Sequence, residues 1–80
     1  MSPDHSAAKL VYMANQIGKF FRSQGEAKAV AGTAEHIKKF WDPRMRSAIL
    51  AHVAAGGDGL DPPVRQALEL IGKDARAGAA

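Results

Sequence analysis

The apolar residues of the chain recur at intervals of three and four residues, the spacing that places them on one side of an α-helix. One such stripe runs from Leu10 to Phe20 or Phe21. The next segment carries a second stripe, which consists of Val30, Ala31, Ala34, Ile37 and Trp41. No segment shows the alternating β-branched and aromatic residues, bounded by turn residues, that are typical of a strand. The pattern therefore predicts an all-α protein.

Glycines and prolines divide the apolar pattern into four predicted helices. The first begins near Ser2 or Asp4, with Pro3 tolerated in its first turn, and ends at Gly25. The second covers residues 26–40 and is rich in alanine, so neighbouring helices can approach it closely.

Two sequences in which aspartate precedes proline mark the starts of the third and fourth helices. Asp42 precedes Pro43, and Asp61 precedes Pro62. The Asp side chain caps the first N–H groups of a helix, and proline fits the first turn. The residue before a proline also avoids the α region, which ends the preceding helix. We therefore expect the third helix to begin at Pro43.

Glycines set the expected ends of these two helices. Gly56 and Gly57 should end the third helix because glycine readily adopts a positive φ. The fourth should end before Gly72, with the last eight residues frayed. The chain then forms one helical domain over residues 1–80, with an ordered core of about residues 6–72. Short connections predict antiparallel neighbours in a small bundle or an open cluster of about four short helices.

Two further glycines, Gly18 and Gly32, lie inside predicted helices. Glycine in a helix interior costs about 1 kcal/mol relative to alanine, so each position should mark a close helix crossing or a break. We favour crossings at both positions. A break would instead split the second helix at Gly32 and Thr33.

The composition narrows the classes of function that this chain can have. Eighty residues form one small domain whose own core gives only marginal stability, which favours a binding partner. The sequence has no cysteine, so disulfides, thiolate metal sites and iron–sulfur ligation are excluded. His5, His36 and His52 lack the spacing of paired metal ligands, and no serine or threonine has a recognisable base beside it. We expect no cofactor, metal or catalytic activity in this chain alone.

The sequence also indicates where in the cell the protein is expected. No apolar stretch approaches the roughly 20 residues of a membrane span. The N-terminal segment lacks the basic and apolar regions of a secretory signal. A cytoplasmic protein without a membrane contact is therefore expected.

Positive charge and aromatic residues gather in one part of the chain. The formal net charge is +3, and residues 36–46, HIKKFWDPRMR, contain four Lys or Arg residues against one Asp. Phe40 and Trp41 lie in this segment, and a second aromatic pair is formed by Phe20 and Phe21. Adjacent residues on a helix point about 100° apart, so one member of each pair is expected to face a partner.

The candidate interface residues are Phe21, Lys38, Lys39, Trp41, Arg44 and Arg46. Aromatic residues and arginine are enriched in protein interfaces, which favours a binding role for this set. The alternative for the aromatic residues is that they fill the core while the lysines face solvent. If Trp41 is an interface anchor, its removal should weaken binding, whereas a core role predicts a loss of helicity.

Two other functions remain open from the residues alone. A small basic nucleic-acid-binding protein could use the charge of residues 36–46 against phosphates, although any acidic partner would fit equally well. A helical homo-oligomer is the other alternative. The GGDG sequence at residues 56–59 gives little support for a phosphate loop, because it follows a helix and lacks the lysine of a P-loop.

Three stretches of the sequence carry a resemblance to a known family. They are KLVYMANQIGKFFRSQG, AVAGTAEHIKKFWDPRMRSAILAH and GGDGLDPPVRQAL, and together they cover about residues 9–71. In this order the stretches resemble the delta subunit of NAD-dependent formate dehydrogenases that contain molybdenum or tungsten. The most specific parts are MANQIGKFF, residues 13–21, and FWDPRMR, residues 40–46. Ile37, where leucine is expected, is a conservative departure.

The resemblance implies a place in a cytoplasmic complex that oxidises formate to carbon dioxide and passes the electrons to NAD. In such a complex the alpha subunit holds molybdopterin guanine dinucleotide with molybdenum or tungsten and iron–sulfur clusters. The beta and gamma subunits carry FMN, further clusters and the NAD site. The delta subunit is an accessory chain without redox groups, so the implied partners are the alpha, beta and gamma subunits and not a nucleic acid or a membrane. No catalytic residue is carried over to this sequence.

Overall fold

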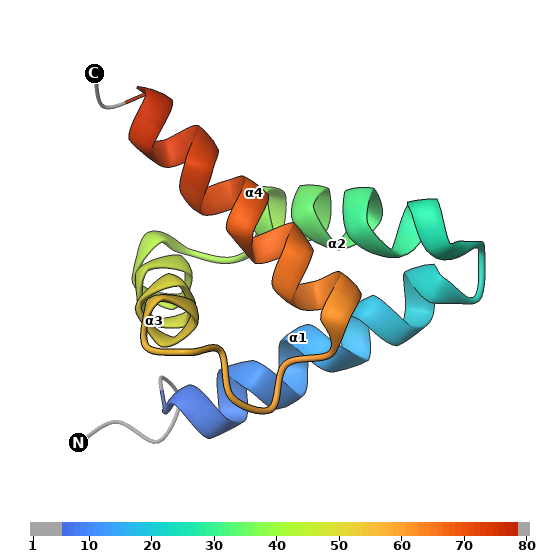
Figure 1. Cartoon of the computed structure of the whole chain (residues 1–80), viewed down its shortest axis with the longest axis horizontal. Coiled ribbons are helices and arrows are strands. Elements are labelled where there is room, and N and C mark those ends of the chain that lie inside the picture. The colour runs from blue at the N-terminus through green and yellow to red at the C-terminus, as the bar shows by residue number, and fades with distance from the viewer. Residues whose placement is uncertain (1–5, 79–80) are drawn as a thin grey trace.

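The computed structural model describes residues 6–78, and this part of the chain folds into four α-helices without a strand (Figure 1). The helices are α1 (Ala7–Arg22), α2 (Glu26–Phe40), α3 (Pro43–Ala54) and α4 (Pro62–Gly78). The all-α prediction is confirmed.

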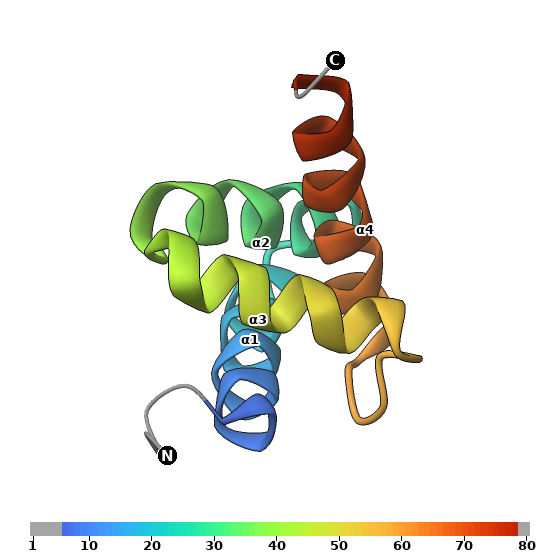
Figure 2. The same ribbon diagram turned by 90° about the vertical axis from the view of Figure 1, so that its left-hand side faces the viewer.

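The four helices form an open cluster in which only α1 and α2 make an antiparallel hairpin (Figure 1). Helix α4 packs across this hairpin, with contacts to both helices. Helix α3 crosses α1 at a steep angle and contacts α4 as well, as the second view shows (Figure 2). Of the two architectures that the sequence left open, the structure therefore has the open cluster.

The starts of α1 and α3 are fixed by side-chain caps. Residues 2–4, where we expected the first helix to begin, lie outside the described residues. Within the described residues α1 begins after Ser6, whose hydroxyl accepts a hydrogen bond from the Lys9 N–H at 3.3 Å. At α3 the Asp42 carboxylate accepts from the Met45 N–H at 2.9 Å. The predicted cap at Asp42 and the bounds of the second helix are both confirmed.

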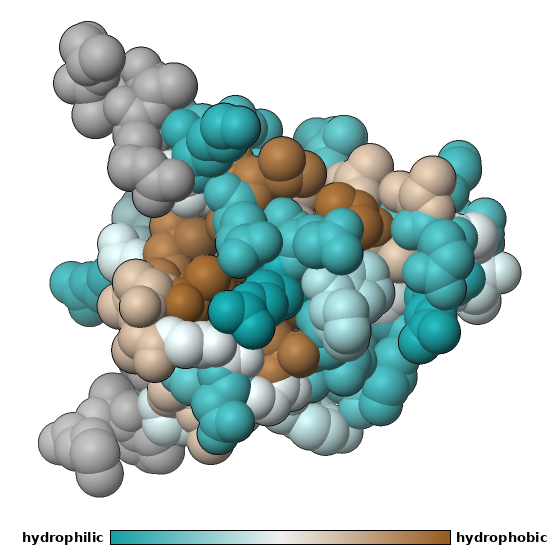
Figure 3. All heavy atoms as spheres, in the orientation of Figure 1, coloured by the Kyte–Doolittle hydropathy of each residue, from teal (hydrophilic) through white to brown (hydrophobic). Residues whose placement is uncertain are grey.

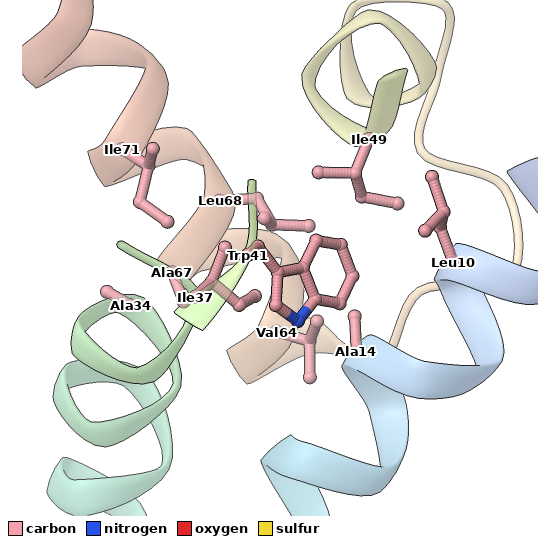
Figure 4. Close-up of a cluster of buried hydrophobic side chains, with 10 residues drawn as sticks. All are labelled: Leu10, Ala14, Ala34, Ile37, Trp41, Ile49, Val64, Ala67, Leu68 and Ile71. Atoms are coloured by element: carbon pink, nitrogen blue, oxygen red, sulfur yellow. The ribbon is translucent and has the colours of Figure 1, made fainter. Parts of the chain in front are cut away.

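The hydrophobic core lies where all four helices meet, with the indole of Trp41 at its centre (Figure 4). Trp41 follows the last residue of α2 and has an extended backbone, with ψ at 136°. Its side chain therefore leaves the helical progression of α2 and turns into the core. The core contains ten buried residues, namely Leu10, Ala14, Ala34, Ile37, Trp41, Ile49, Val64, Ala67, Leu68 and Ile71.

Gly18 and Gly32 mark close crossings, as we predicted. A Cβ atom on Gly18 would overlap the side chain of Val64 on α4. A Cβ on Gly32 would overlap the ring of Phe21 on α1. Helix α2 continues through Gly32 without a break.

The loop from Ala55 to Asp61 is held against α1 by a single side chain. The Asn15 amide donates to the Gly59 carbonyl at 3.0 Å, and its oxygen accepts from the Asp61 N–H at 3.0 Å. Gly56 and Gly57 have φ values of 127° and 67°, which confirms that they end α3 in a conformation that favours glycine. This loop sets the position from which α4 starts.

The expected end of the fourth helix at Gly72 is wrong, because α4 continues to Gly78. The cost of one glycine, about 1 kcal/mol, is small enough for the helix-forming residues after it to offset. Asp74, in the continued part, lies 3.6 Å from Lys38 of α2 and connects the two helices.

Candidate functional site

Each aromatic pair places one member on the surface, but in both pairs it is the member that was not among the candidate interface residues. Phe40 is 71% exposed, whereas Trp41 is 5% exposed and belongs to the core. In the first pair Phe20 is 61% exposed, and Phe21 is half-buried against α2. Trp41 therefore cannot be the exposed anchor that the sequence suggested, because its indole packs inside the molecule.

Lys38 and Lys39 point to different sides of α2. The Lys38 ammonium lies 3.6 Å from the Asp74 carboxylate of α4, and the Lys39 ammonium lies 3.2 Å from the Glu35 carboxylate one turn earlier. Both pairs are well exposed, and exposed ion pairs contribute at most about 1 kcal/mol to stability. Both lysines are therefore available to a partner, but not on one common face.

Arg44 and Arg46 also have separate environments. Arg44 is exposed on the first turn of α3. The Arg46 guanidinium donates to the Lys38 carbonyl at 3.1 Å and to the Trp41 carbonyl at 2.8 Å, at the C-terminal end of α2. A cation is favourable at a helix C-terminus, where the last carbonyl groups lack partners inside the helix. Arg46 thus has a structural role at the joint between α2 and α3 that the sequence did not reveal.

The charge of residues 36–46 does not form one basic surface. Lys38 and Lys39 each contact a carboxylate, and Arg46 is used at the α2–α3 joint. A basic patch for phosphate binding requires cations gathered on one face. The fold therefore gives little support to the nucleic-acid alternative.

A row of aromatic rings crosses the outer side of the α1–α2 hairpin. The ring centroids are 5.1 Å apart for Phe20 and Phe21, 6.3 Å for Phe21 and His36, and 4.8 Å for His36 and Phe40. The first two contacts are edge-on, which is a favourable arrangement for aromatic pairs. We call these four residues the aromatic row.

Three members of the aromatic row, Phe21, His36 and Phe40, line a surface groove of about 540 Å³, which we call the aromatic groove. One side of the groove is a stripe along α2 at helical spacing, and α1 supplies Phe21. The stripe consists of Lys28, Ala31, Gly32, Glu35, His36, Lys39 and Phe40. Ala31, which we expected on the core side of this helix, is exposed here.

Two residues of this groove, Phe21 and Lys39, were among the candidates predicted from the sequence, and its other residues were not. The stripe was visible as residues spaced three and four apart on α2, opposite the core stripe. It contains small and charged residues between its rings, so an apolar pattern alone does not reveal it. Phe40 was not among the candidates, because the sequence did not show which of Phe40 and Trp41 faces outward.

A second, smaller groove lies on another face of the described part. The face that carries α4 is mainly hydrophilic, with apolar residues gathered where α3 and α4 meet (Figure 3). A groove of about 140 Å³ lies there, with Leu50, Val53 and Leu68 in its walls. The aromatic groove has the larger volume of the two, about 540 Å³ against about 140 Å³.

The histidines do not gather into a metal site within the described residues. His36 belongs to the aromatic row, and the His52 Nε2 atom is hydrogen-bonded to the Asp58 carbonyl at 2.7 Å. His5 lies outside the described residues. Across the part of the chain that the structure covers, no three His, Asp or Glu side chains form a group that could hold a metal ion.

Between residues 6 and 78, no helix is both long enough and apolar enough to cross a bilayer.

Comparison with known proteins identifies one family. The model of the family described as NADH-dependent formate dehydrogenase delta subunit FdsD matches residues 9–68, which include most of α1, all of α2 and α3, and the first part of α4. No curated protein and no solved structure gives a significant match. The matched region contains the whole aromatic groove.

Proposed function

The chain belongs to the delta-subunit family of NADH-dependent formate dehydrogenases, and from this membership we propose that it is a non-catalytic accessory subunit that docks on the catalytic subunit of such a complex. The family match over residues 9–68 is the observation that carries the proposal. Docking would support assembly, stability or cofactor retention in the catalytic subunit.

The division of chemistry within the complex is part of this proposal. The catalytic alpha subunit would hold molybdopterin guanine dinucleotide with molybdenum or tungsten, and the other subunits would hold FMN and iron–sulfur clusters. This chain cannot ligate a cluster through cysteine, because its sequence has none. Its contribution would be contact surface, in a complex located in the cytoplasm.

The surface of the fold supports a role in binding. Phe20 and Phe40 are each more than half exposed in the isolated chain. Large aromatic residues provide much of the binding energy in protein interfaces when a partner buries them. A chain of this size also has a small stability margin, which binding of a partner to the folded state would increase.

Co-expression tests the proposal directly. The formate dehydrogenase subunits are produced with and without this chain, and the complex is purified through a tag on the catalytic subunit. We expect the chain to co-purify and the complex made without it to show less formate-dependent NAD reduction per milligram. A complex of equal yield and activity that never retains the chain would overturn the proposal.

A melting experiment distinguishes a chain that acts only during assembly from one that remains bound in the finished complex. Thermal melts are recorded for the purified complex before and after adding the isolated chain. A higher melting temperature is expected for a subunit that stays in the finished enzyme. An unchanged melting temperature with restored yield in cells would indicate that the chain acts during assembly only.

A further inference from the structure

The two long faces of α2 have different neighbours. One face, which includes Ala34 and Ile37, is buried in the core. The other is the stripe of the aromatic groove, where Ala31 and Phe40 remain exposed. Phe21 covers the middle of this stripe at Gly32 and leaves the rest open. The shape is suited to an elongated apolar segment that lies along α2.

The side chains that line the groove carry a net positive charge. Its lining contains Lys28, Lys39 and Glu35, and the Glu35 carboxylate is paired with Lys39 at 3.2 Å. Glu26, the nearest acidic residue to Lys28 in sequence, is paired with Arg22 at 3.1 Å. Within the described residues no carboxylate pairs with Lys28, so one positive charge remains at this end of the groove.

The start of α2 lies at the same end, and the one acidic residue of its first turn, Glu26, is paired with Arg22. Gly25 is the N-cap residue of α2 and provides no side-chain hydrogen bond to the first N–H groups. The N-terminal end of a helix carries a partial positive charge that favours a carboxylate. Lys28 lies on the first turn of α2, beside these groups.

We propose that the aromatic groove binds an apolar segment of another subunit of the formate dehydrogenase complex, with an Asp or Glu of that segment at Lys28 and an apolar side chain at Phe40. This inference rests on the proposed function. Lys28 and Phe40 are twelve residues apart on α2, which corresponds to about 18 Å at the rise of an α-helix. A partner helix of about twelve residues has the length that spans both contacts.

The charge favours this partner over a second copy of the chain. Two copies joined through their grooves would offer Lys28 no unpaired carboxylate, because Glu35 is paired with Lys39 and Glu26 with Arg22. Each copy also carries a net charge of +3, which opposes association of two copies. A partner segment with an unpaired carboxylate can pair with Lys28 and is not repelled by the positive charge of the chain.

Two variants test the two ends of the groove. Phe40→Ser removes an exposed ring, and Lys28→Glu reverses the unbalanced charge. Matched controls are Tyr12→Ser, another exposed aromatic that does not line the groove, and Lys73→Glu on α4. Circular dichroism first establishes that each variant keeps the parent's helicity.

Association is measured between the labelled chain and formate dehydrogenase complex purified from cells that lack it. We expect Phe40→Ser and Lys28→Glu each to weaken association at least tenfold, with both controls within twofold of the parent. The Lys28→Glu loss should shrink as salt is raised, because it arises from charge. Folded groove variants that bind like the parent would overturn the inference.

A photo-reactive residue in place of Ala31, on the open part of the groove, identifies the occupant. We expect a cross-linked peptide of another subunit that contains both apolar and acidic residues. A peptide from elsewhere with no acidic residue, or a cross-link to a second copy of this chain, would overturn the inference.

The outcomes also separate this inference from the proposed function. If a control variant abolishes association and the groove variants do not, the chain docks through another surface, and only the inference fails. If the parent chain shows no association with the complex, both fail.

Discussion

The ring of Phe21 lies directly on Gly32, at a distance that leaves no room for a Cβ atom on residue 32. This contact joins α1 to α2 and lets the two helices approach closely. It also holds Phe21 beside His36, with ring centroids 6.3 Å apart. The same glycine therefore supports both the hairpin and the aromatic row.

Gly32→Ala should destabilise the protein although alanine is the better helix former. Helix propensity favours the substitution by about 1 kcal/mol, whereas overpacking against the Phe21 ring costs about 1–3 kcal/mol. Urea unfolding followed by circular dichroism should show a net loss of stability on the order of 1 kcal/mol.

A double variant isolates the ring contact. In a Phe21→Ala background the extra methyl group has space, so Gly32→Ala should become neutral or stabilising there. An equal loss in both backgrounds would mean that the ring is not the obstacle.

Trp41→Ala should destabilise the isolated chain strongly, whereas Phe40→Ser should leave its stability nearly unchanged. Loss of a buried Trp side chain costs about 3–5 kcal/mol, which is comparable to the whole stability of a small domain. Phe40 is exposed, so its replacement should change stability by less than about 0.5 kcal/mol. Far-ultraviolet circular dichroism at 25 °C distinguishes an unfolded Trp41→Ala chain from a helical Phe40→Ser chain. A folded Trp41→Ala variant would contradict the buried position.

The elements of this fold were predictable where local chemistry decides them. The cap at Asp42 acts on N–H groups within three residues of it, and Gly56 and Gly57 act through their own φ values. Each of these signals depends only on residues that are close together in the sequence. Both boundaries therefore agree with the structure.

The positions that the sequence left open or placed wrongly depend on contacts distant along the chain. Trp41 was a candidate interface residue with a core role as the alternative, and its extended backbone turns the indole towards residues of α1, α3 and α4. Helix α4 was expected to end at Gly72, yet the continued part reaches Lys38 through Asp74. The burial of Trp41 and the contact between Asp74 and Lys38 therefore could not be predicted from neighbouring residues alone.

The candidate site was predictable only in part for the same reason. Phe21 was identified because aromatic residues are enriched in interfaces, and Lys39 because it belongs to the basic segment of residues 36–46. The groove between them exists because Gly32 lets α1 approach α2 and because Ala31 is small. Gly32 and Ala31 have no functional group that indicates binding, so the groove can be recognised only once the crossing of α1 and α2 is known.

Thr33→Val should stabilise the protein. The Thr33 hydroxyl is fully buried, and the described residues provide no hydrogen-bond partner for it. A buried polar group without a partner costs about 1–3 kcal/mol, and valine keeps the shape of the side chain. Chemical unfolding should therefore show a gain on the order of 1 kcal/mol.

Thr33→Ser is the matched control, because it retains the hydroxyl and removes a buried methyl group. We expect a loss of about 1 kcal/mol from the missing methyl. A Thr33→Val chain less stable than the parent would show that the hydroxyl makes a hydrogen bond in solution.

Arg46 and Arg44 should differ in their contribution to stability although they lie two residues apart on α3. The Arg46 guanidinium donates to the carbonyl groups of Lys38 and Trp41 at 3.1 and 2.8 Å, whereas Arg44 is exposed. Hydrogen bonds from a charged donor contribute about 1.5–3 kcal/mol, and partial exposure of Arg46 places its contribution at the lower end. Arg46→Met, which keeps much of the aliphatic stem, should therefore lower the free energy of unfolding by about 1–2 kcal/mol. Arg44→Met should leave it within about 0.5 kcal/mol of the parent.

The near-ultraviolet signal of Trp41 provides a second measurement at the same joint. Loss of the Arg46 contacts loosens the carbonyl of Trp41, so the indole signal of the folded Arg46→Met variant should weaken, while Arg44→Met retains it. Lysine at position 46 separates charge from geometry, because it offers a cation to the end of α2 without the planar guanidinium that reaches two carbonyl groups. Arg46→Lys should recover only part of the lost stability. Full recovery would indicate that the charge alone acts on the helix terminus, and equal stability of the Arg44→Met and Arg46→Met variants would contradict the role of Arg46 at the α2–α3 joint.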